Sequence, residues 1–360
     1  MQTAKGMKDL TTGNPFKLIL FFAFPVFLGC VFQQLYNMAD TIIVGNTVGP
    51  DAFTGVGLTG SITFLVVGSM NGLTAGFSVK VAQAYGAGDE SGVRRAVGMS
   101  YLLSIAIAVL VTAIAATLTG VLLNLMQTPA TYYEYAYRYL FVIFCGIPAT
   151  VFYNIVAGLL RAVGDSKTPL YFLIFSAVLN VGLDFLFILV FRMYYEGAAL
   201  ATVLSQLVSG SLCLLFALHR YPILRPAKSD FQWDWHLAGG HLAQGLPMAL
   251  QFSITAIGCM VQQTALNGLD SALPGVVTAY TAASKIDSIA TQTFVALGTA
   301  MATYAGQNYG AGRYDRIRKG VFVGIGQCRH RVYFYRRTVR AAHEALPQYR
   351  PELQRRRALW

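Results

Sequence analysis

Long apolar stretches alternate with short polar loops along most of this 360-residue chain. A helix needs about 20 consecutive apolar residues to cross a lipid bilayer. The stretches that meet this length cover residues 16–40, 53–79, 97–123, 135–158, 169–191, 197–218, 242–268 and 276–304. A ninth begins near Gly320 and loses its apolar character after Gly326. The pattern predicts an all-α polytopic membrane protein with eight full spans and part of a ninth.

Basic residues are unevenly distributed between the loops. Fifteen Lys and Arg residues lie in the N-terminal segment and in the loops after the second, fourth, sixth and eighth spans, whereas the opposite loops hold Arg192 alone. Basic residues accumulate on the cytoplasmic side of membrane proteins. We therefore expect the N-terminus to lie in the cytoplasm.

The composition agrees with a membrane protein and excludes other classes. Charged residues make up 12% of the chain, about half their share in soluble domains. The net charge of +11 does not indicate nucleic-acid binding, because nine arginines lie in residues 327–360 alone. The sequence contains no metal-binding, nucleotide-binding or catalytic constellation, so we expect neither an enzyme nor a cofactor. The five histidines lie in or beside polar segments and are expected to be solvated.

Two segments of the chain repeat one another. Residues 83–97 and 307–321 are identical at seven of fifteen positions, at an offset of 224. Because six spans separate the copies, both enter the membrane from the same side, which predicts a parallel repeat of two lobes. The boundaries that follow are a first lobe of six spans over 1–218, a polar cytoplasmic linker over 219–241, an incomplete second lobe over 242–326 and a basic tail over 327–360.

One span carries a carboxylate within its apolar sequence. Asp184 follows Asn180 by four residues within 170–191, and this spacing places both on one helix face. A carboxylate at the centre of a membrane helix costs about 2.5–3.5 kcal/mol and marks a functional site by default. From the order of the spans, Asp40 and Thr202 lie at a similar depth, near the outer side of the first lobe. Asp40, Asn180, Asp184 and Thr202 can therefore share one level, with Asp184 as a candidate to bind an ion.

The chain resembles the multidrug and toxic compound extrusion (MATE) family, in particular its prokaryotic DinF-like branch. The resemblance extends over about residues 10–326 and rests on Pro25 and the segments 37–45, 85–88, 158–169 and 180–184. It implies two six-helix bundles arranged as a V. The implied activity is cation-coupled export of small organic, often cationic, drugs across a bacterial or archaeal cytoplasmic membrane. The resemblance also implies an ion-coupling site in the first lobe, at residues that match Asp40, Asn180, Asp184 and Thr202.

The resemblance also implies a substrate cavity. Polar positions that line the first lobe in the family match Gln34, Tyr36, Asn37 and Asn154. Lys285 is a further candidate, because a lysine inside a span is a functional candidate by default; a buried structural network is the alternative.

The sequence leaves the coupling ion open. Two neighbouring buried carboxyls can share and release a proton, whereas oxygens from Asp184, Asn180 and Thr202 also suit Na⁺. No other metal and no nucleic acid is expected. The alternative is a structural polar lock between helices.

The second lobe departs from the family's twelve spans. The abrupt change after Gly326 suggests an out-of-frame, C-terminally truncated chain; a basic tail that contacts anionic lipid is the alternative. Other functions are a non-transporting remnant and, less favoured, a lipid-linked oligosaccharide flippase, which would need basic residues along its cavity.

Overall fold

The computed structural model describes residues 7–47, 57, 59–126, 128–270, 276–327 and 329, without the side chains of residues 41, 44–46 and 263–290. The described backbone is helical, with short turns and no strand. The main helices are α1 (Pro15–Thr47), α3 (Gly60–Gly86), α4 (Glu90–Leu125), α5 (Ala130–Cys145), α6 (Ile147–Ala162), α7 (Lys167–Phe185), α8 (Tyr194–Arg220), α9 (Trp235–Asp270) and α10 (Val276–Gly310). A π-helical turn, Leu186–Val190, continues α7, and helical backbone also covers 314–327.

The described helices agree with the predicted spans. Six are long and apolar enough to cross a membrane, or seven if α5 and α6 count as one broken span. These two meet at a 46° bend. Pro148 in the first turn of α6 has no amide hydrogen to continue the ladder of α5, and Gly146 at the bend packs against Val203 of α8. The eighth predicted span, residues 276–304, falls within α10, which is not among these candidate spans.

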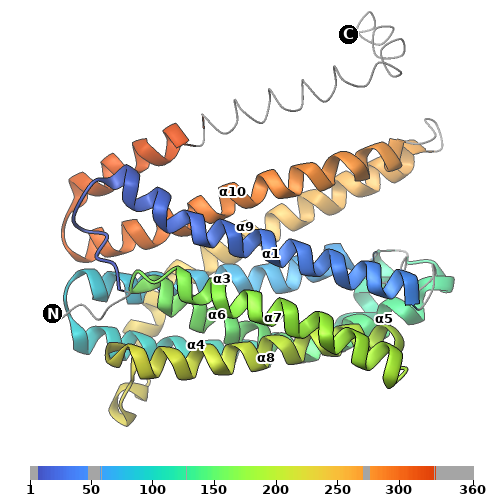
Figure 1. The fold of residues 1–360 in the computed structure, drawn as a ribbon, viewed down its shortest axis with the longest axis horizontal. Helices are drawn as coiled ribbons and strands as arrows, with labels where there is room; N and C mark the ends of the chain where they lie inside the picture. The colour runs from blue at the N-terminus through green and yellow to red at the C-terminus, as the bar shows by residue number, and fades with distance from the viewer. Residues whose placement is uncertain are drawn as a thin grey trace, which may run out of the picture.

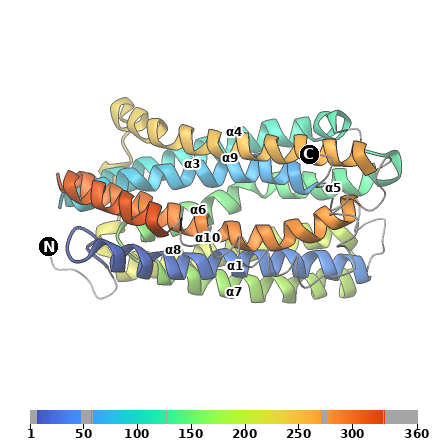
Figure 2. The ribbon, with the colours of Figure 1, turned by 90° about the horizontal axis from the view of Figure 1, so that it is seen from above.

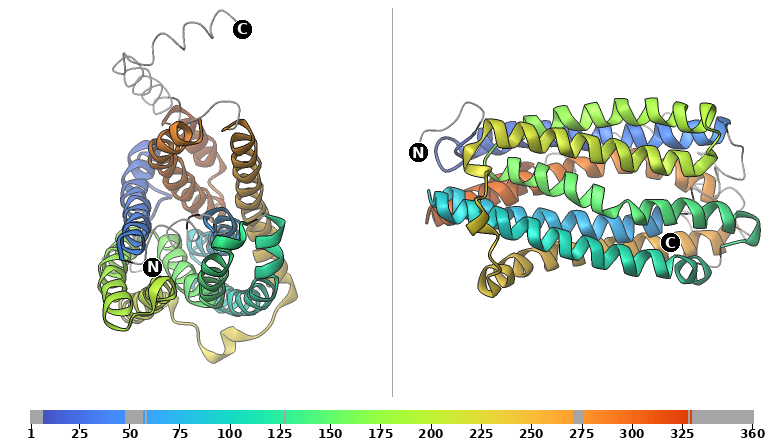
Figure 3. Two further views of the ribbon diagram at one scale, coloured as in Figure 1. Left: turned by 90° about the vertical axis from the view of Figure 1, so that its right-hand side faces the viewer. Right: turned by 90° about the horizontal axis from the view of Figure 1, so that it is seen from below.

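The helices run roughly parallel to one long axis (Figures 1 and 2). Within the first lobe, α1 packs on α7, α7 on α8, α8 on α6, and α6 on α3 and α4. The second lobe meets the first mainly where α9 packs on α3 and where α10 packs on α1 and α3. The end-on view in Figure 3 shows α9 and α10 beside the first bundle. The site described below therefore lies in a lobe whose α1 and α3 both touch the second lobe.

The α3–α9 contact is a close crossing of two backbones. A Cβ atom added at Gly76 would lie 2.4 Å from the Gly245 Cα atom, and one at Gly72 would lie 2.6 Å from the Met248 carbonyl oxygen. Ser69 and Ser253 are joined by a hydrogen bond of 2.7 Å across the same crossing. Small residues of α3, Gly72 and Gly76, thus allow the two backbones to approach closely.

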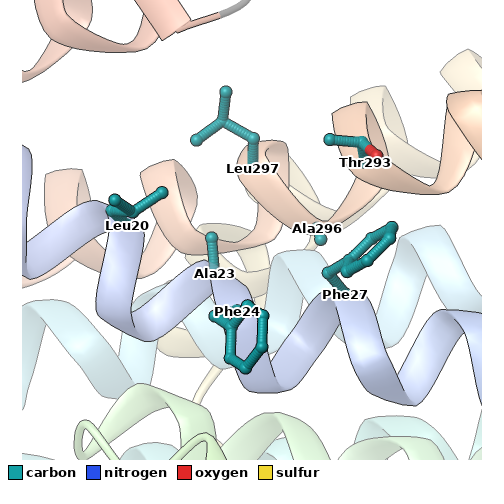
Figure 4. A pocket seen from close by; sticks show the side chains of 7 residues that line it. All are labelled: Leu20, Ala23, Phe24, Phe27, Thr293, Ala296 and Leu297. Carbon is teal, nitrogen blue, oxygen red and sulfur yellow. The ribbon is translucent and has the colours of Figure 1, made fainter. Parts of the chain in front are cut away.

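The α1–α10 contact encloses a small apolar pocket (Figure 4). Its lining is Leu20, Ala23, Phe24 and Phe27 of α1 with Thr293, Ala296 and Leu297 of α10. No titratable group lines this pocket, so it does not belong to the polar cluster in the first lobe.

The start of α9 differs from the expected linker boundary at 242. Asp234 Oδ1 accepts hydrogen bonds from the His236 and Leu237 amides, and this cap starts the helix at Trp235. The longer helix buries His241 completely against α4, where its Nε2 atom lies 3.1 Å from Ser100 Oγ. The expectation of solvated histidines is therefore wrong for His241. The basic tail lies outside the described residues apart from Gln327 and Arg329.

The repeated segments share one local structure. Ala87 N donates to Gln83 O and Ala311 N to Gln307 O, both at 3.0 Å. The glycines that follow, Gly88 and Gly312, both have positive φ, 73° and 68°, a conformation that glycine adopts without steric cost. Both copies therefore end a helix in the same way, as a true internal repeat should.

Candidate ion-coupling site

Three of the four predicted ion-site residues form one hydrogen-bonded chain. Thr202 Oγ1 lies 3.2 Å from Asp40 Oδ2, to which it donates, and Asn180 Nδ2 donates to Thr202 Oγ1 at 3.4 Å. Thr202 Oγ1 also lies 3.1 Å from the Ala198 carbonyl. A hydroxyl carries one hydrogen, so Asp40 and the Ala198 carbonyl compete for it. The hydroxyl can therefore respond to the charge of Asp40.

Asp184 lies beside this chain and is fully buried. Its carboxyl group adjoins that of Asp40, close enough for the two to interact directly. Both Asp184 oxygens, Asp40 Oδ1 and Asn180 Oδ1 lack an N–H or O–H donor among the described residues. Two buried carboxylates repel each other strongly in a low-dielectric interior. A proton or a cation between them removes that repulsion.

The backbone places Asp184 next to an irregular turn. The α-helix ends at Phe185 and passes directly into the π-helical turn. Such turns are uncommon and often occur at functional sites. Asp184 thus lies in the last turn of the α-helix, two residues before the wider π-helical turn begins.

A second layer of polar side chains lies one helical turn from Asp40 and Thr202. Tyr36 precedes Asp40 by four residues on α1, and Gln206 follows Thr202 by four on α8. Gln206 Nε2 donates to Tyr36 Oη at 3.3 Å, and Thr150 Oγ1 of α6 donates to Gln206 Oε1 at 2.6 Å. The two layers connect the same pair of helices.

The second layer continues toward the other lobe. Asn154 Nδ2 donates to the Thr150 carbonyl at 2.9 Å and to Asn71 Oδ1 of α3 at 2.7 Å. Asn71 precedes Gly72, which packs on α9. Sequence reasoning identified Tyr36 and Asn154 but missed Gln206, Thr150 and Asn71. The signal for Gln206 was its four-residue spacing from Thr202.

The other predicted cavity residues are Gln34, Asn37 and Lys285. Gln34 is half-buried and Asn37 is exposed, both on α1. Lys285 lies on α10, where its side chain is outside the described ones. The structure therefore brings Tyr36 and Asn154 into one hydrogen-bonded network through Gln206 and Thr150.

The arrangement suits a small cation. In the described part of the chain, Asp40 and Asp184 form no ion pair with Lys or Arg. The described part of the chain also contains no group of three or more His, Cys, Asp or Glu side chains that could hold a metal ion. Carboxylate, amide and hydroxyl oxygens are hard ligands. The cluster can thus accept a proton or offer oxygens to Na⁺.

The sequence matches a known protein family and curated relatives. The MatE family profile matches residues 25–186 and 247–326, more than half of the chain, which include Asp40, Asn180 and Asp184 but not Thr202. The chain is 32% identical, over 86% of its length and 68% of the relative's, to the "Probable multidrug resistance protein YpnP" of Bacillus subtilis. It is 23% identical to the "FAD transporter" of Shewanella oneidensis, with 86% of this chain and 68% of that protein covered.

A solved structure shows the same architecture. The outward-facing conformation of a multidrug resistance MATE family transporter superposes with a TM-score of 0.81 at 26% identity, over 91% of this chain and 72% of that one. The chain spans about two thirds of the length of the curated relatives named above. Family members are transporters, not enzymes. The chain belongs to the MatE family of multidrug and toxic compound extrusion proteins.

Proposed function

We propose that this chain carries the cation-coupling lobe of an antiporter that exports small organic molecules, with H⁺ or Na⁺ as the coupling ion. The carrying observation is the buried Asp40–Asp184 pair, which has no basic partner among the side chains that the structure describes. The relatives' names, which denote multidrug resistance proteins, support the class of transport. Asp40, Asp184, Asn180 and Thr202 supply the oxygens of the ion site.

Cation binding can act on the helices through charge alone. Asp40 belongs to α1 and Asp184 to α7, so repulsion between two carboxylates favours separation of these helices. A bound proton or Na⁺ favours their approach. Because α1 also packs on α10, this movement extends to the second lobe. The polar layer from Tyr36 to Asn71 provides a second route to the α3–α9 crossing.

The polar and acidic side chains of the first lobe bear on the class of substrate. Tyr36, Asn154 and Gln206 offer hydrogen-bonding groups in the first lobe, and two acidic groups favour cationic substrates. The relative named as a FAD transporter indicates that related proteins also carry phosphate-bearing molecules. We propose organic cations and treat anionic nucleotides as the alternative outcome of a substrate screen.

The proposed location is a cytoplasmic membrane of a prokaryote, with the N-terminus inside. The basic loops support this orientation, because the N-terminal segment, the α3–α4 turn and the linker gather at one end of the bundle (Figure 1).

Ion binding tests the proposal without requiring transport. Purified protein in detergent is expected to take up a proton on acidification, or to bind Na⁺ in a calorimetric titration, through a site that Asp184→Asn removes. Gln34→Ala, outside the described polar network, is the matched control. Equal ion uptake by wild type and Asp184→Asn would refute the assignment.

Transport itself is the second test. Everted vesicles that contain the chain are expected to move ethidium in response to a pH or Na⁺ gradient, and Asp184→Asn is expected to abolish this movement at equal membrane content. The gradient that drives transport identifies the ion.

A further inference from the structure

The two repeat copies meet each other at the end of the molecule that holds the N-terminal segment. A Cβ atom added at Gly86 would lie 1.9 Å from the Gln307 carbonyl oxygen, and one at Gly310 would lie 1.8 Å from the Gln83 carbonyl oxygen. Gln83 and Gln307, like Gly86 and Gly310, are equivalent positions of the repeat. The ends of α3 and α10 therefore touch backbone to backbone, in a reciprocal contact between the lobes.

The Gln307 side chain adds a third segment to this contact. It is fully buried on α10; its Oε1 accepts from Leu10 N at 2.9 Å and its Nε2 donates to the Ala162 carbonyl of α6 at 2.8 Å. One amide thus joins the N-terminal segment, the first lobe and the second lobe. In Figures 1 and 2 the N-terminal loop, in dark blue, lies beside the C-terminal end of α10.

Three further side chains of the second copy bind the backbone of residues 10–13. Asn308 Nδ2 donates to the Leu10 carbonyl at 3.2 Å, and Arg313 Nη1 donates to the Thr11 carbonyl at 2.7 Å. Arg316 Nη1 donates to the Gly13 carbonyl at 3.0 Å, and its Nε donates to Asn308 Oδ1 at 3.0 Å. The second lobe therefore provides hydrogen-bond donors to the carbonyls of residues 10, 11 and 13. These carbonyls belong to an irregular segment and would otherwise need water as their partner.

These three residues are places where the two copies differ. By the offset of 224, Asn308, Arg313 and Arg316 correspond to Ala84, Asp89 and Gly92. In the first copy, Asp89 accepts from Gly92 N and caps α4. That cap also holds the pKa of Asp89 below its usual value, mainly through the Gly92 amide. The second copy has lost this cap and gained donors for the N-terminal segment.

The N-terminal segment, residues 8–13, also packs against the first lobe. Gly164 follows α6 with φ of 90°, and a Cβ atom there would lie 2.1 Å from the Lys8 carbonyl oxygen. Asp9 Oδ1 accepts from Thr11 N at 2.8 Å, which folds the segment into a turn. Residues 8–13 thus contact both lobes at once.

We propose that residues 8–13 form a strap that holds the two lobes together at this end and must be released before they can separate there. The proposal rests on the proposed function, in which this end faces the cytoplasm and opens during transport. Asn308, Arg313 and Arg316 are the residues of the second lobe that fasten the strap. The strap stabilises the close contact between the ends of α3 and α10, which Gly86 and Gly310 make possible.

The test replaces second-copy residues by their first-copy counterparts. Asn308→Ala with Arg316→Gly removes most of the fastening, and Arg313→Asp removes one bond at an exposed position where folding is not at risk. Arg318→Ala, an exposed arginine outside the strap, is the matched control. Spin labels at Glu90 and Lys319, both exposed, report the distance between the lobes in lipid nanodiscs, in a background without the native cysteines.

Both strap variants are expected to increase the long-distance population at least tenfold over Arg318→Ala. A distance distribution equal to that of the control, in Arg313→Asp or in a folded double variant, would overturn the proposal. The measurement needs neither ion nor substrate. A strap effect without ion uptake would refute only the proposed function, and ion uptake without a strap effect would refute only the strap.

Discussion

Thr202 of α8 donates a hydrogen bond of 3.2 Å to Asp40 of α1, across a sequence separation of 162 residues. The bond links two helices that carry polar groups at the same two levels, Asp40 with Thr202 and Tyr36 with Gln206. Because the Thr202 hydroxyl can turn instead to the Ala198 carbonyl, its position depends on whether Asp40 is charged.

The Thr202 hydroxyl is expected to set the pH at which the carboxyl pair binds a proton. Thr202→Val keeps the shape of the side chain but removes a donor to the ionised Asp40, worth about 1.5–3 kcal/mol. Protonation should therefore begin about one pH unit higher or more. Infrared titration of the carboxyl band measures this shift. Thr202→Ser should restore the wild-type curve, and an unshifted Thr202→Val curve would show that the bond has no such role.

The α3–α9 crossing is expected to tolerate no added methyl group. Gly76→Ala places a Cβ atom against Gly245, and overpacking of this kind costs about 1–3 kcal/mol. The thermal midpoint of unfolding in detergent should fall. Gly258→Ala on α9, where no atom lies within 4 Å of the added Cβ, is the control and should be neutral or stabilising. Equal midpoints for both variants would contradict the close crossing.

His241 is expected to stabilise the contact between α9 and α4. Its Nδ1 lies 2.8 Å from the Leu237 carbonyl oxygen, and its ring meets Phe77 edge to face with the ring centroids 5.8 Å apart. His241→Phe retains an aromatic ring but removes these hydrogen bonds, each worth about 0.5–1.5 kcal/mol. Thermal unfolding should detect this loss, whereas His236→Phe at an exposed position should not. A His241→Phe protein as stable as wild type would mean that the hydrogen bonds contribute nothing.

Tyr221, just after α8, is expected to make the thermal stability of the protein depend on pH in the alkaline range. Its hydroxyl donates to Asp165 Oδ2 at 2.7 Å, and burial, followed by this carboxylate, raises the pKa of Tyr221 above its usual value. The contribution of the neutral phenol is therefore complete below pH of about 10 and is lost as the pH rises toward the folded-state pKa. Thermal midpoints from pH 8 to 11 should fall more steeply for wild type than for Tyr221→Phe. Parallel curves would argue against this linkage.

Much of the fold follows from local sequence properties. Each long apolar run became a helix, and the charged loops gathered at one end, because span length and loop polarity are set by the bilayer. Asp184 and Asn180 were recognisable because a carboxylate among apolar residues has a large energetic cost. The order of the spans predicted that Asp40 and Thr202 lie at the same depth, and the family resemblance grouped them with Asn180 and Asp184 in one site.

The missed features depend on which helices are neighbours. Gln206 and Thr150 are ordinary polar residues in sequence, and only the packing of α8 on α6 and α1 makes them a network. His241 seemed to belong to a polar linker, because the Asp234 cap that extends α9 is a short signal beside an apolar run. The binding of Leu10 by Asn308 joins residues almost 300 positions apart, which no local pattern encodes.

The reciprocal contact of Gly86 with Gln307 and of Gly310 with Gln83 also bears on the origin of the chain. In an interface between two identical subunits related by a two-fold axis, each residue pair occurs twice with its members exchanged. The two halves of this chain keep that exchange at the ends of α3 and α10. An ancestor of one lobe could therefore have made the same contact as a homodimer, before gene duplication and fusion placed both copies in one polypeptide and allowed Ala84 and Asn308 to diverge.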